Sequence, residues 1–354
     1  MLLKNAINYY YLTMNLEDLI VLNLQRFKKR EETTNLLIKE FEESGSFKPN
    51  FSKDDYNAAN EEIKKAERFS VKICPFNSDN FPEPLRKIKD PPLLLYVKGE
   101  IKDSDMLSIG IVGARKCTEY GRSIARNFSN ELATLGITIV SGLAYGIDAS
   151  AHNGALDVNG RTIAFLGSGI DVVYPQSNKP LYEKIVKSGA IISEFPIGTQ
   201  PSQYNFPFRN RLISGFSLGI VVVEAEEKSG SLITAGFALE QGKDVFAVPG
   251  NITSTLSRGT NKLIKDGAIP LTDVSDILEN IKEFKDLKRE KRGVKLSNEE
   301  NSILRVLENG ANTIEVISTG TKIKPIRLTQ ILTEMEFKGL VKRVGGRYIK
   351  VYES

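Results

Sequence analysis

Residues 105–284 alternate between short apolar runs and longer helix-length stretches, and this alternation limits the fold more than any other feature of the chain. Buried runs joined by helical connections predict an α/β fold, with a parallel sheet, right-handed crossovers and helices on its faces. The predicted strands are residues 108–112, 137–140, 162–166, 190–193, 220–223 and 245–248, and the helices between them include 123–135, 148–156 and 232–241.

The loops that follow the predicted strands are rich in glycine, serine and charged residues. Ligands of parallel sheets bind at the carboxyl ends of the strands, so we expect these loops to share one edge and to form a site there. They include Gly113-Ala114-Arg115, Ser141-Gly142 with the residues up to Asp148, Gly167-Ser168-Gly169, and the segment after residue 223.

The stretch 206–235, FPFRNRLISGFSLGIVVVEAEEKSGSLITA, combines three features of an anion site. Arg209 and Arg211 flank Asn210 in a predicted turn, an apolar strand follows at 219–223, and Ser229-Gly230-Ser231 then precede a helical pattern. The N–H groups at the start of a helix lack partners within the helix and attract anions. Arginine binds phosphate through paired hydrogen bonds, so the ligand is expected to carry phosphates.

Several other residues on the predicted edge are candidates for the site. Arg115 and Lys179 are basic, and Tyr182, three residues after Lys179, would either stack on an unpaired base or pack in the core. His152 is interpreted as a hydrogen-bonded structural residue of a helix rather than as a general base. Glu224 would either pair with Glu240 as a catalytic carboxylate or hold one of the arginines.

The sequence gives no support for catalysis, a cofactor or a metal. No nucleophile stands beside an evident base, so the chain is not expected to be an enzyme. Gly167-Ser168-Gly169 lacks the third glycine of a dinucleotide motif, and residues 236–243 have the wrong spacing for a P-loop. Two cysteines and one histidine cannot form the usual four-ligand zinc site.

The chain ends differ from the middle in pattern and charge. Residues 291–354 carry 12 basic and 7 acidic side chains within a total net charge of +4. Ser297 and Glu300 have capping-box spacing, and Gly345-Gly346 between two strand-like runs predicts a hairpin. A helix-turn-helix with such a wing reads duplex DNA or contacts protein, and the sequence leaves both open. The predicted organisation is a helical domain at 1–74, with helices at 9–27, 31–41 and 54–69, and a proline-rich extended lead-in at 75–104. The sheet domain at 105–284, a charged linker at 285–296 and a winged-helix-like domain at 297–354 follow.

No basic, apolar and small-residue pattern of a signal peptide opens the sequence, and no apolar run approaches bilayer length. The expectation is a cytoplasmic protein without a membrane partner.

Taken together, the motifs resemble the DNA-processing protein A family, also called DprA or Smf. The resemblance rests on GARKCTEYG, SGLAYGIDASAH, FLGSGIDVVYPQSNKPLY, SEFPIGTQPSQYNFPFRNRLISG, SGSLITA and VFAVPG, in order over more than 130 residues, and on the lead-in FPEPLRKIKDPPLLLYVKG.

That resemblance implies an extended Rossmann-like domain between a sterile-alpha-motif-like helical domain and a winged-helix-like domain. It implies sequence-independent binding of single-stranded DNA, homodimerisation and loading of the RecA recombinase during DNA uptake and recombination. Carried over by motif, phosphates would meet Arg115, Lys179 and the turn Arg209, Asn210 and Arg211. Gly142, Ser229, Gly230 and Ser231 would offer donors, and Tyr182 would stack on a base.

Two alternatives remain. The chain could be a nucleotide-processing enzyme of the phosphoribohydrolase type. However, Pro249-Gly250-Asn251 lacks the P-G-G-x-G-T pattern that such enzymes contain. It could also be a duplex-DNA-binding regulator acting through the winged helix.

Overall fold

The computed structural model describes residues 11, 13–28, 51–285, 297–308, 312–337, 340–344 and 347–350. The chain forms two compact units, Met1–Glu283 and Phe284–Ser354. In the described ranges, no helix is both long and apolar enough to cross a membrane.

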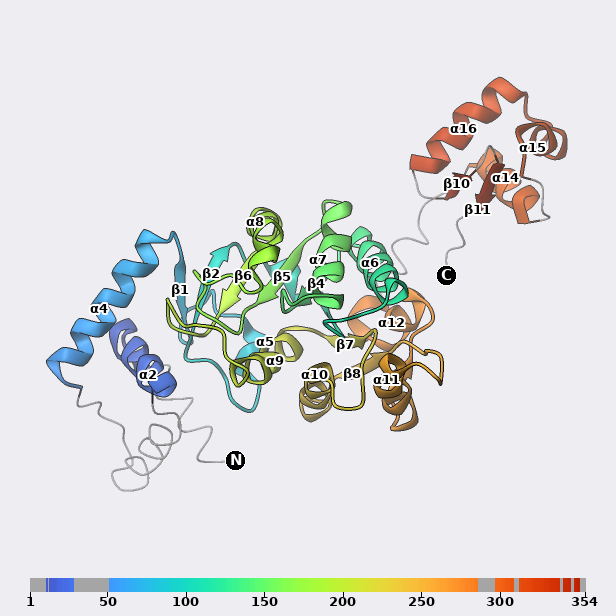
Figure 1. The fold of residues 1–354 in the computed structure, drawn as a ribbon. Helices are drawn as coiled ribbons and strands as arrows, with labels where there is room; N and C mark the ends of the chain where they lie inside the picture. Colours follow the sequence, from blue (N-terminus) through green and yellow to red (C-terminus); the bar gives the residue numbers. More distant parts are fainter. Residues whose placement is uncertain are drawn as a thin grey trace. The chain divides into compact units, whose positions relative to one another are not determined.

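The first unit is built on a nine-stranded sheet with the order β1-β2-β6-β5-β4-β3-β7-β8-β9 (Figure 1). Strands β3 to β9 pair in parallel, which confirms the predicted α/β fold, and each predicted strand is present within one residue of its expected bounds. The strands are β1 Lys72–Pro75, β2 Leu94–Gly99, β3 Ser108–Val112, β4 Thr138–Ser141, β5 Thr162–Phe165, β6 Ala190–Ser193, β7 Gly219–Val222, β8 Asp244–Ala247 and β9 Ile269–Pro270.

The proline-rich segment predicted as an extended lead-in at 75–104 contains strand β2 and so belongs in part to the sheet. Strand β2 pairs antiparallel with both β1 and β6, so β1 and β2 extend the parallel sheet at one edge. Strand β1 also crosses the boundary predicted at residue 75. The prolines flank β2 rather than interrupt it, which leaves its N–H groups free to pair.

The strand order contains a reversal that places the site. The chain runs from β3 through β4 and β5 to β6 in one direction and then returns to the other side of β3 to form β7 and β8. The connections that leave β3 and β7 therefore diverge, and they leave a crevice beyond the carboxyl ends of these two neighbouring strands. Such a reversal point is where open α/β sheets bind ligands.

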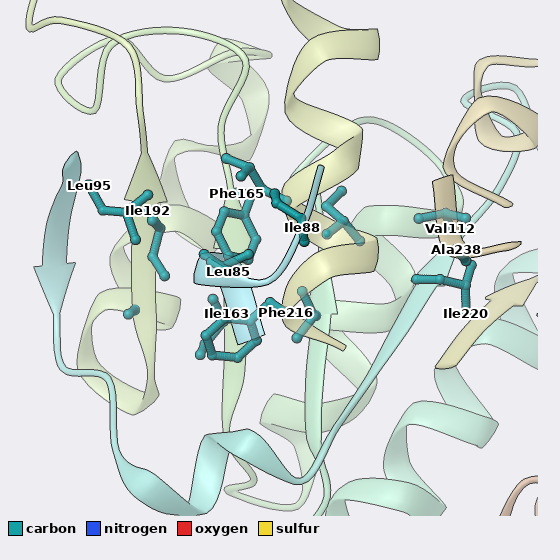
Figure 2. Packing of buried hydrophobic residues seen from close by; sticks show 14 of the residues in the cluster. Leu85, Ile88, Leu95, Val112, Ile163, Phe165, Ile192, Phe216, Ile220 and Ala238 are labelled. Carbon is teal, nitrogen blue, oxygen red and sulfur yellow. The ribbon is translucent and has the colours of Figure 1, made fainter. Parts of the chain in front are cut away.

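Helices cover both faces of the sheet (Figure 1). Helices α5, α9 and α10 pack on the face whose core includes Phe165, Ile192 and Phe216 (Figure 2). Alternate residues of the same strands, such as Ala164 and Ile191, face the other core with α7 and α8, as strand geometry requires. The helices are α5 Glu83–Arg86, α6 Glu119–Thr134, α7 Ile147–Asp157, α8 Lys179–Ser188, α9 Asn205–Phe216, α10 Gly230–Glu240, α11 Thr255–Lys265 and α12 Val274–Asn280.

Two N-terminal helices pack in the same unit. Helix α2 (Leu16–Lys28) and helix α4 (Lys53–Arg68) add Ile20 and Ala59 to the core on the α7 and α8 face. These helices correspond to the predictions at 9–27 and 54–69, and the helix predicted at 31–41 lies outside the described residues. A separate sterile-alpha-motif-like domain at 1–74 stays a prediction.

The second unit contains three helices and a hairpin among its described residues. Ser297 N donates to Glu300 Oε2 at 2.8 Å, and Glu300 N donates to Ser297 Oγ at 3.1 Å, so the predicted capping box is confirmed. The Gly345-Gly346 turn lies outside the described residues, and the winged-helix assignment stays a prediction. The elements are α14 Asn298–Glu308, α15 Ile314–Thr321, α16 Pro325–Phe337, and the antiparallel pair β10 Val341–Val344 and β11 Arg347–Lys350.

Candidate nucleic-acid interface

A pocket of about 510 Å³ opens at the reversal point of the sheet. Its walls come from the segments after β3, β4 and β7, and from the start of α9, so the predicted shared edge is observed. Its lining includes Gly113, Arg115, Ala144, Asp148, Tyr174, Phe206, Arg209, Asn210, Ser229, Gly230, Ser231 and Thr234.

The two arginines of the RNR motif lie in helix α9, so the prediction of a turn is wrong. Leu212, Ile213 and Phe216 recur at helical spacing and bury one side of α9 on the sheet. Pro207 lies in the first turn, where a missing N–H costs no intrahelical hydrogen bond. Residues two positions apart on a helix point to different sides, and so Arg209 and Arg211 have different surroundings.

Arg209 lies in the floor of the pocket, with 3% of its surface exposed. Its Nη1 donates to the carbonyl oxygens of Gly142, at 2.8 Å, and Phe165, and its Nε donates to Asn210 Oδ1 at 3.1 Å. Its Nη2 makes no hydrogen bond within the described part of the chain. Burial lowers the pKa of Arg209 to about 10, with the charge of Asp148 opposing this shift. The side chain is therefore still a cation at neutral pH, with one NH₂ group available to a ligand.

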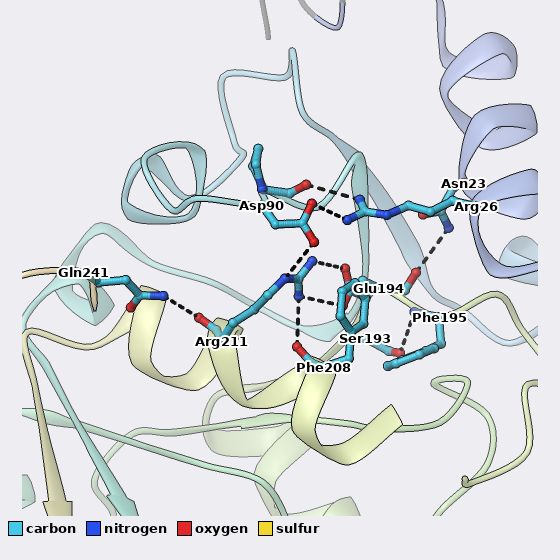
Figure 3. Close-up of polar contacts among 10 residues, drawn as sticks. Asn23, Arg26, Asp90, Ser193, Glu194, Phe195, Phe208, Arg211 and Gln241 are labelled. Carbon is cyan, nitrogen blue, oxygen red and sulfur yellow. Dashed lines mark hydrogen bonds and ion pairs between the residues drawn. The ribbon is translucent and has the colours of Figure 1, made fainter. Parts of the chain in front are cut away.

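Arg211 is absent from the lining of the pocket and instead joins a network of ion pairs with Glu194 and Asp90 (Figure 3). Its Nη1 and Nη2 each donate to one oxygen of Glu194 at 2.7 Å, and its guanidinium lies 3.9 Å from the centre of the Phe208 ring. Asp90 lies between Arg211 and Arg26 of helix α2, at 3.5 Å and 2.5 Å respectively. Arg211 is thus already paired and is not a phosphate ligand, which corrects the prediction from the sequence.

The start of helix α10 lines the pocket, and the donor role of Ser229, Gly230 and Ser231 stays a prediction, since Ser231 N already donates to Ser229 Oγ. Ser229 is the N-cap residue, and its Oγ lies 3.4 Å from Ser231 N and 2.8 Å from Ser231 Oγ. Asn210 Nδ2 donates to Gly230 O at 3.2 Å and so ties α9 to this turn. An anion in the pocket would meet the positive end of the α10 dipole.

Arg115 and Lys179 are both exposed, but they are placed differently. Arg115 lines the pocket, and its guanidinium lies 4.7 Å from the centre of the Phe206 ring. Lys179 is the first residue of α8 and does not line the pocket. Asn178 Nδ2 donates to Leu143 O at 2.9 Å and thereby holds the start of α8 against the loop after β4.

Gly142 contributes to the pocket through its position under Arg209 rather than as a free donor. Its N–H donates to Asp148 Oδ2 at 3.1 Å and its carbonyl accepts from Arg209. A Cβ at this residue would lie 2.5 Å from Arg209 Nη2, so any side chain here would displace the guanidinium. The predicted role of Gly142 as a phosphate donor is therefore wrong, because its N–H already has a partner.

Tyr182 belongs to the core and cannot stack on a base. It is 7% exposed, packs with Leu181 and Ile185 in the core beneath α8, and donates its hydroxyl to Ile170 O at 2.9 Å. Of the two alternatives from the sequence, core packing is confirmed and stacking is wrong. The three-residue spacing from Lys179 does not predict that Tyr182 is exposed, because Lys179 occupies the exposed first position of the helix.

The glutamates proposed as a catalytic or arginine-holding pair have other roles. Glu224 is buried and accepts from Thr118 N at 2.8 Å and from Thr118 Oγ1 at 2.5 Å. It thus fixes the loop between β3 and α6. Glu240 is exposed at the far end of α10.

His152 has the structural role predicted for it. Thr162 Oγ1 donates to Ile139 O, so it accepts from His152 Nδ1, 2.6 Å away. The His152 Nε2 atom is buried without a hydrogen-bond partner. Burial, with the charge of Arg209, lowers the pKa of His152 to about 3, so the ring is neutral in the folded protein.

This burial predicts a loss of stability in mild acid. The unfolded chain binds a proton at its imidazole below pH 6.5 and the folded chain does not until about pH 3, so stability falls as pH decreases through that window. Between pH 7.5 and pH 5 we expect His152 to account for a loss of about 2 kcal/mol. Urea unfolding of the wild type and of His152→Asn at both values measures this, since His152 is the only histidine. An equal pH dependence in both proteins would contradict the prediction.

Sequence reasoning missed three residues of the site: Asp148 as a binding-site group, Tyr174 and Phe206. Asp148 is buried and accepts from the N–H groups of Gly142 and Ala144, and burial raises its pKa. One feature of the sequence could have pointed to Tyr174 and Phe206 as residues of the site: each stands directly before a proline in a loop of the predicted edge.

Comparison with known proteins agrees with this architecture. The family model for DNA recombination-mediator protein A matches residues 72–282. The protein Smf of Escherichia coli is 46% identical over 210 residues, which are 59% of this chain and 56% of that protein. The DNA processing protein DprA of Bacillus subtilis is 42% identical over 217 residues, which are 60% of this chain and 72% of that protein. The chain thus matches little more than half of the Escherichia coli relative's length.

Two solved structures share the fold. The DNA processing protein A of Streptococcus pneumoniae has a TM-score of 0.59 and 33% identity, covering 78% of this chain and 98% of that one. The DNA processing protein A of Helicobacter pylori has a TM-score of 0.53 and 31% identity, covering 60% of this chain and 94% of that one. With the family model matched over the whole of the sheet, the chain belongs to the DNA recombination-mediator protein A family.

Proposed function

We propose that the chain binds single-stranded DNA independently of sequence, through the pocket at the reversal point, and acts as a mediator of DNA recombination. The observation that carries the proposal is Arg209, a buried cation in the lining of this pocket whose Nη2 makes no hydrogen bond within the described residues. Arg115 adds a second positive charge, and the start of α10 adds the positive end of a helix dipole. This combination fits a phosphate better than it fits a neutral ligand.

The relatives support the choice of ligand. The Helicobacter pylori structure concerns that protein's single-stranded DNA binding mode. Loading of the RecA recombinase and homodimerisation, which the family resemblance implies, belong to the same proposal. Analytical ultracentrifugation of the chain, alone and with RecA on an oligonucleotide, tests both. A monomer would contradict homodimerisation, and absence of a ternary complex would contradict RecA loading.

The DNA proposal is tested by fluorescence anisotropy of a labelled oligothymidine with the wild type and with Arg115→Ala plus Lys179→Ala. We expect the double variant to bind more weakly and to show a smaller salt dependence. For single strands each lost phosphate contact reduces the slope of log K against log salt by about 0.7, so the change is about 1.4 if both residues contact phosphates.

A matched control removes two lysines far from the pocket, Lys72→Ala plus Lys187→Ala. Lys72 begins β1 and Lys187 lies in the last turn of α8, and both are exposed. The single variant Arg115→Ala separates the pocket residue from Lys179. Wild-type binding by the double variant, or equal losses in it and in the control, would contradict the assignment. Preference for a duplex over the single strand would contradict the proposed ligand.

A further inference from the structure

Three aromatic side chains lie beside the pocket where a hydrophobic core does not require them. Tyr145 and Tyr174 are 48% and 42% exposed, and Phe206 is half-buried. They come from separate segments: the loop after β4, the loop before α8, and the first turn of α9. Exposed rings that converge on one place from distant segments suggest a surface for a ligand rather than a core.

Phe206 is held firmly at the centre of this group. The Tyr174 and Phe206 ring centres are 5.6 Å apart with planes inclined by 35°, and the Arg115 guanidinium lies 4.7 Å from the Phe206 centre. A Cβ at Gly167 would come within 2.8 Å of Phe206 Cδ1, so the glycine permits the close approach of this ring to the loop after β5.

The aromatic group connects two hollows. Arg115, Tyr174 and Phe206 line the pocket that contains Arg209, and the same three residues line a narrow crevice whose other walls include Tyr145 and Pro175. A ligand anchored in the pocket by a negative group would therefore extend an adjacent part over the two tyrosines. A nucleotide has this arrangement, with an anionic phosphate and a flat base attached to the same sugar.

We propose that Tyr145 and Tyr174 form a stacking surface for unpaired bases next to the phosphate pocket. The inference rests on the proposed function and adds to it the reason for preferring a single strand. Bases in a duplex are stacked on one another and offer no free face, whereas an unpaired base can lie on an aromatic ring or on the plane of a guanidinium. This surface takes the place of Tyr182, which is buried.

The first test compares an oligothymidine with an abasic oligonucleotide of equal length, which keeps the phosphates and lacks the bases. We expect the wild type to bind the oligothymidine more tightly. Tyr145→Ala plus Tyr174→Ala should weaken oligothymidine binding roughly 5- to 150-fold per stacked base that is lost, and should weaken abasic binding by a smaller factor. Tyr145→Phe plus Tyr174→Phe keeps both rings and should retain the wild-type preference.

The outcomes separate this inference from the proposed function. A wild type that binds neither oligonucleotide contradicts both. A wild type that binds both equally, or an alanine variant that retains the preference, contradicts stacking while DNA binding stands. An alanine variant that dissociates into smaller species with unchanged affinity per chain, seen by light scattering, would show that the tyrosines contact a second copy and would also overturn the inference.

A second readout uses the absence of tryptophan from the chain. The substitution Tyr174→Trp introduces a single indole whose emission reports a base stacked on it. We expect its fluorescence to be quenched on addition of oligothymidine and to be unaffected by the abasic oligonucleotide at saturating concentration. Quenching of equal size by both would mean that the ring senses phosphate binding nearby rather than a base, and would contradict the proposed contact.

Discussion

Replacement of Arg211 by alanine is expected to lower the free energy of unfolding by about 3–5 kcal/mol, the usual effect of removing one partner of a buried ion pair. Arg211 and Glu194 are 4% and 1% exposed, and they form two hydrogen bonds of 2.7 Å (Figure 3). Without the guanidinium, the Glu194 carboxylate would remain buried, with only more distant cations to compensate its charge. Urea unfolding followed by circular dichroism measures the change.

An exposed pair of similar geometry provides the control. Arg126 donates to both oxygens of Asp157, with Nη2 2.9 Å from Oδ1, but both side chains are open to solvent. We expect Arg126→Ala to cost no more than about 1 kcal/mol, because water screens the pair and solvates the remaining carboxylate. The double variant Arg211→Met plus Glu194→Leu should recover most of the stability that Arg211→Ala loses. Equal losses for Arg211→Ala and Arg126→Ala would contradict this account of the network.

The position of this network explains why a residue outside the pocket matters to it. Arg211 lies in the same helix as Arg209 and Asn210, and the network connects that helix with α2, the Asp90 segment and the end of β6. At the other end of α9, Lys243 Nζ donates to the carbonyl oxygens of Ser214, Gly215 and Ser217. Helix α9 is thus fixed at its middle by the buried Arg211 and at its end by the half-buried Lys243, and this holds Arg209 in the floor of the pocket.

The sequence predicted the sheet well because each buried strand is a short apolar run, a pattern that depends on neighbouring residues alone. The sequence also predicted that the loops after the strands share one edge, but the position of the pocket on that edge depends on the strand order, which the sequence did not predict. The sequence could not show that β2 joins the sheet, because its antiparallel pairing with β6 joins residues nearly 100 positions apart.

The errors at the site have a common physical origin. The pair Arg209 and Arg211 was expected to act together, and this would hold in a turn but not on a helix, where one residue faces the pocket and the other faces Glu194. The sequence left Tyr182 open between stacking on a base and packing in the core, and the amphipathic face of α8 buries it. Whether a side chain is free to bind depends on its partners, and these come from segments distant in sequence.

Arg209→Met is expected to reduce the affinity for single-stranded DNA about 10- to 100-fold, because hydrogen bonds to charged groups contribute about 1.5–3 kcal/mol. Methionine keeps an apolar chain of similar length against Gly142 and Phe165 but removes the donor that faces the pocket. The measurement is anisotropy of labelled oligothymidine at a fixed salt concentration. The loss should be larger than that of Arg115→Ala, since Arg115 is exposed and its interaction with a phosphate is weakened by water and salt.

Arg209→Lys distinguishes charge from geometry. A lysine would retain the positive charge but could not donate to Gly142 O and Phe165 O while also offering a second, fixed NH₂ group to a phosphate. We therefore expect intermediate affinity from Arg209→Lys and the weakest from Arg209→Met.

The wild type should also gain thermal stability on addition of oligothymidine, since a ligand that binds only the folded state stabilises it. Arg209→Met should gain less at the same concentration. If Arg209→Met is folded and binds as tightly as the wild type, the phosphate does not lie in this pocket, and the basic residues of the second unit become the next candidates.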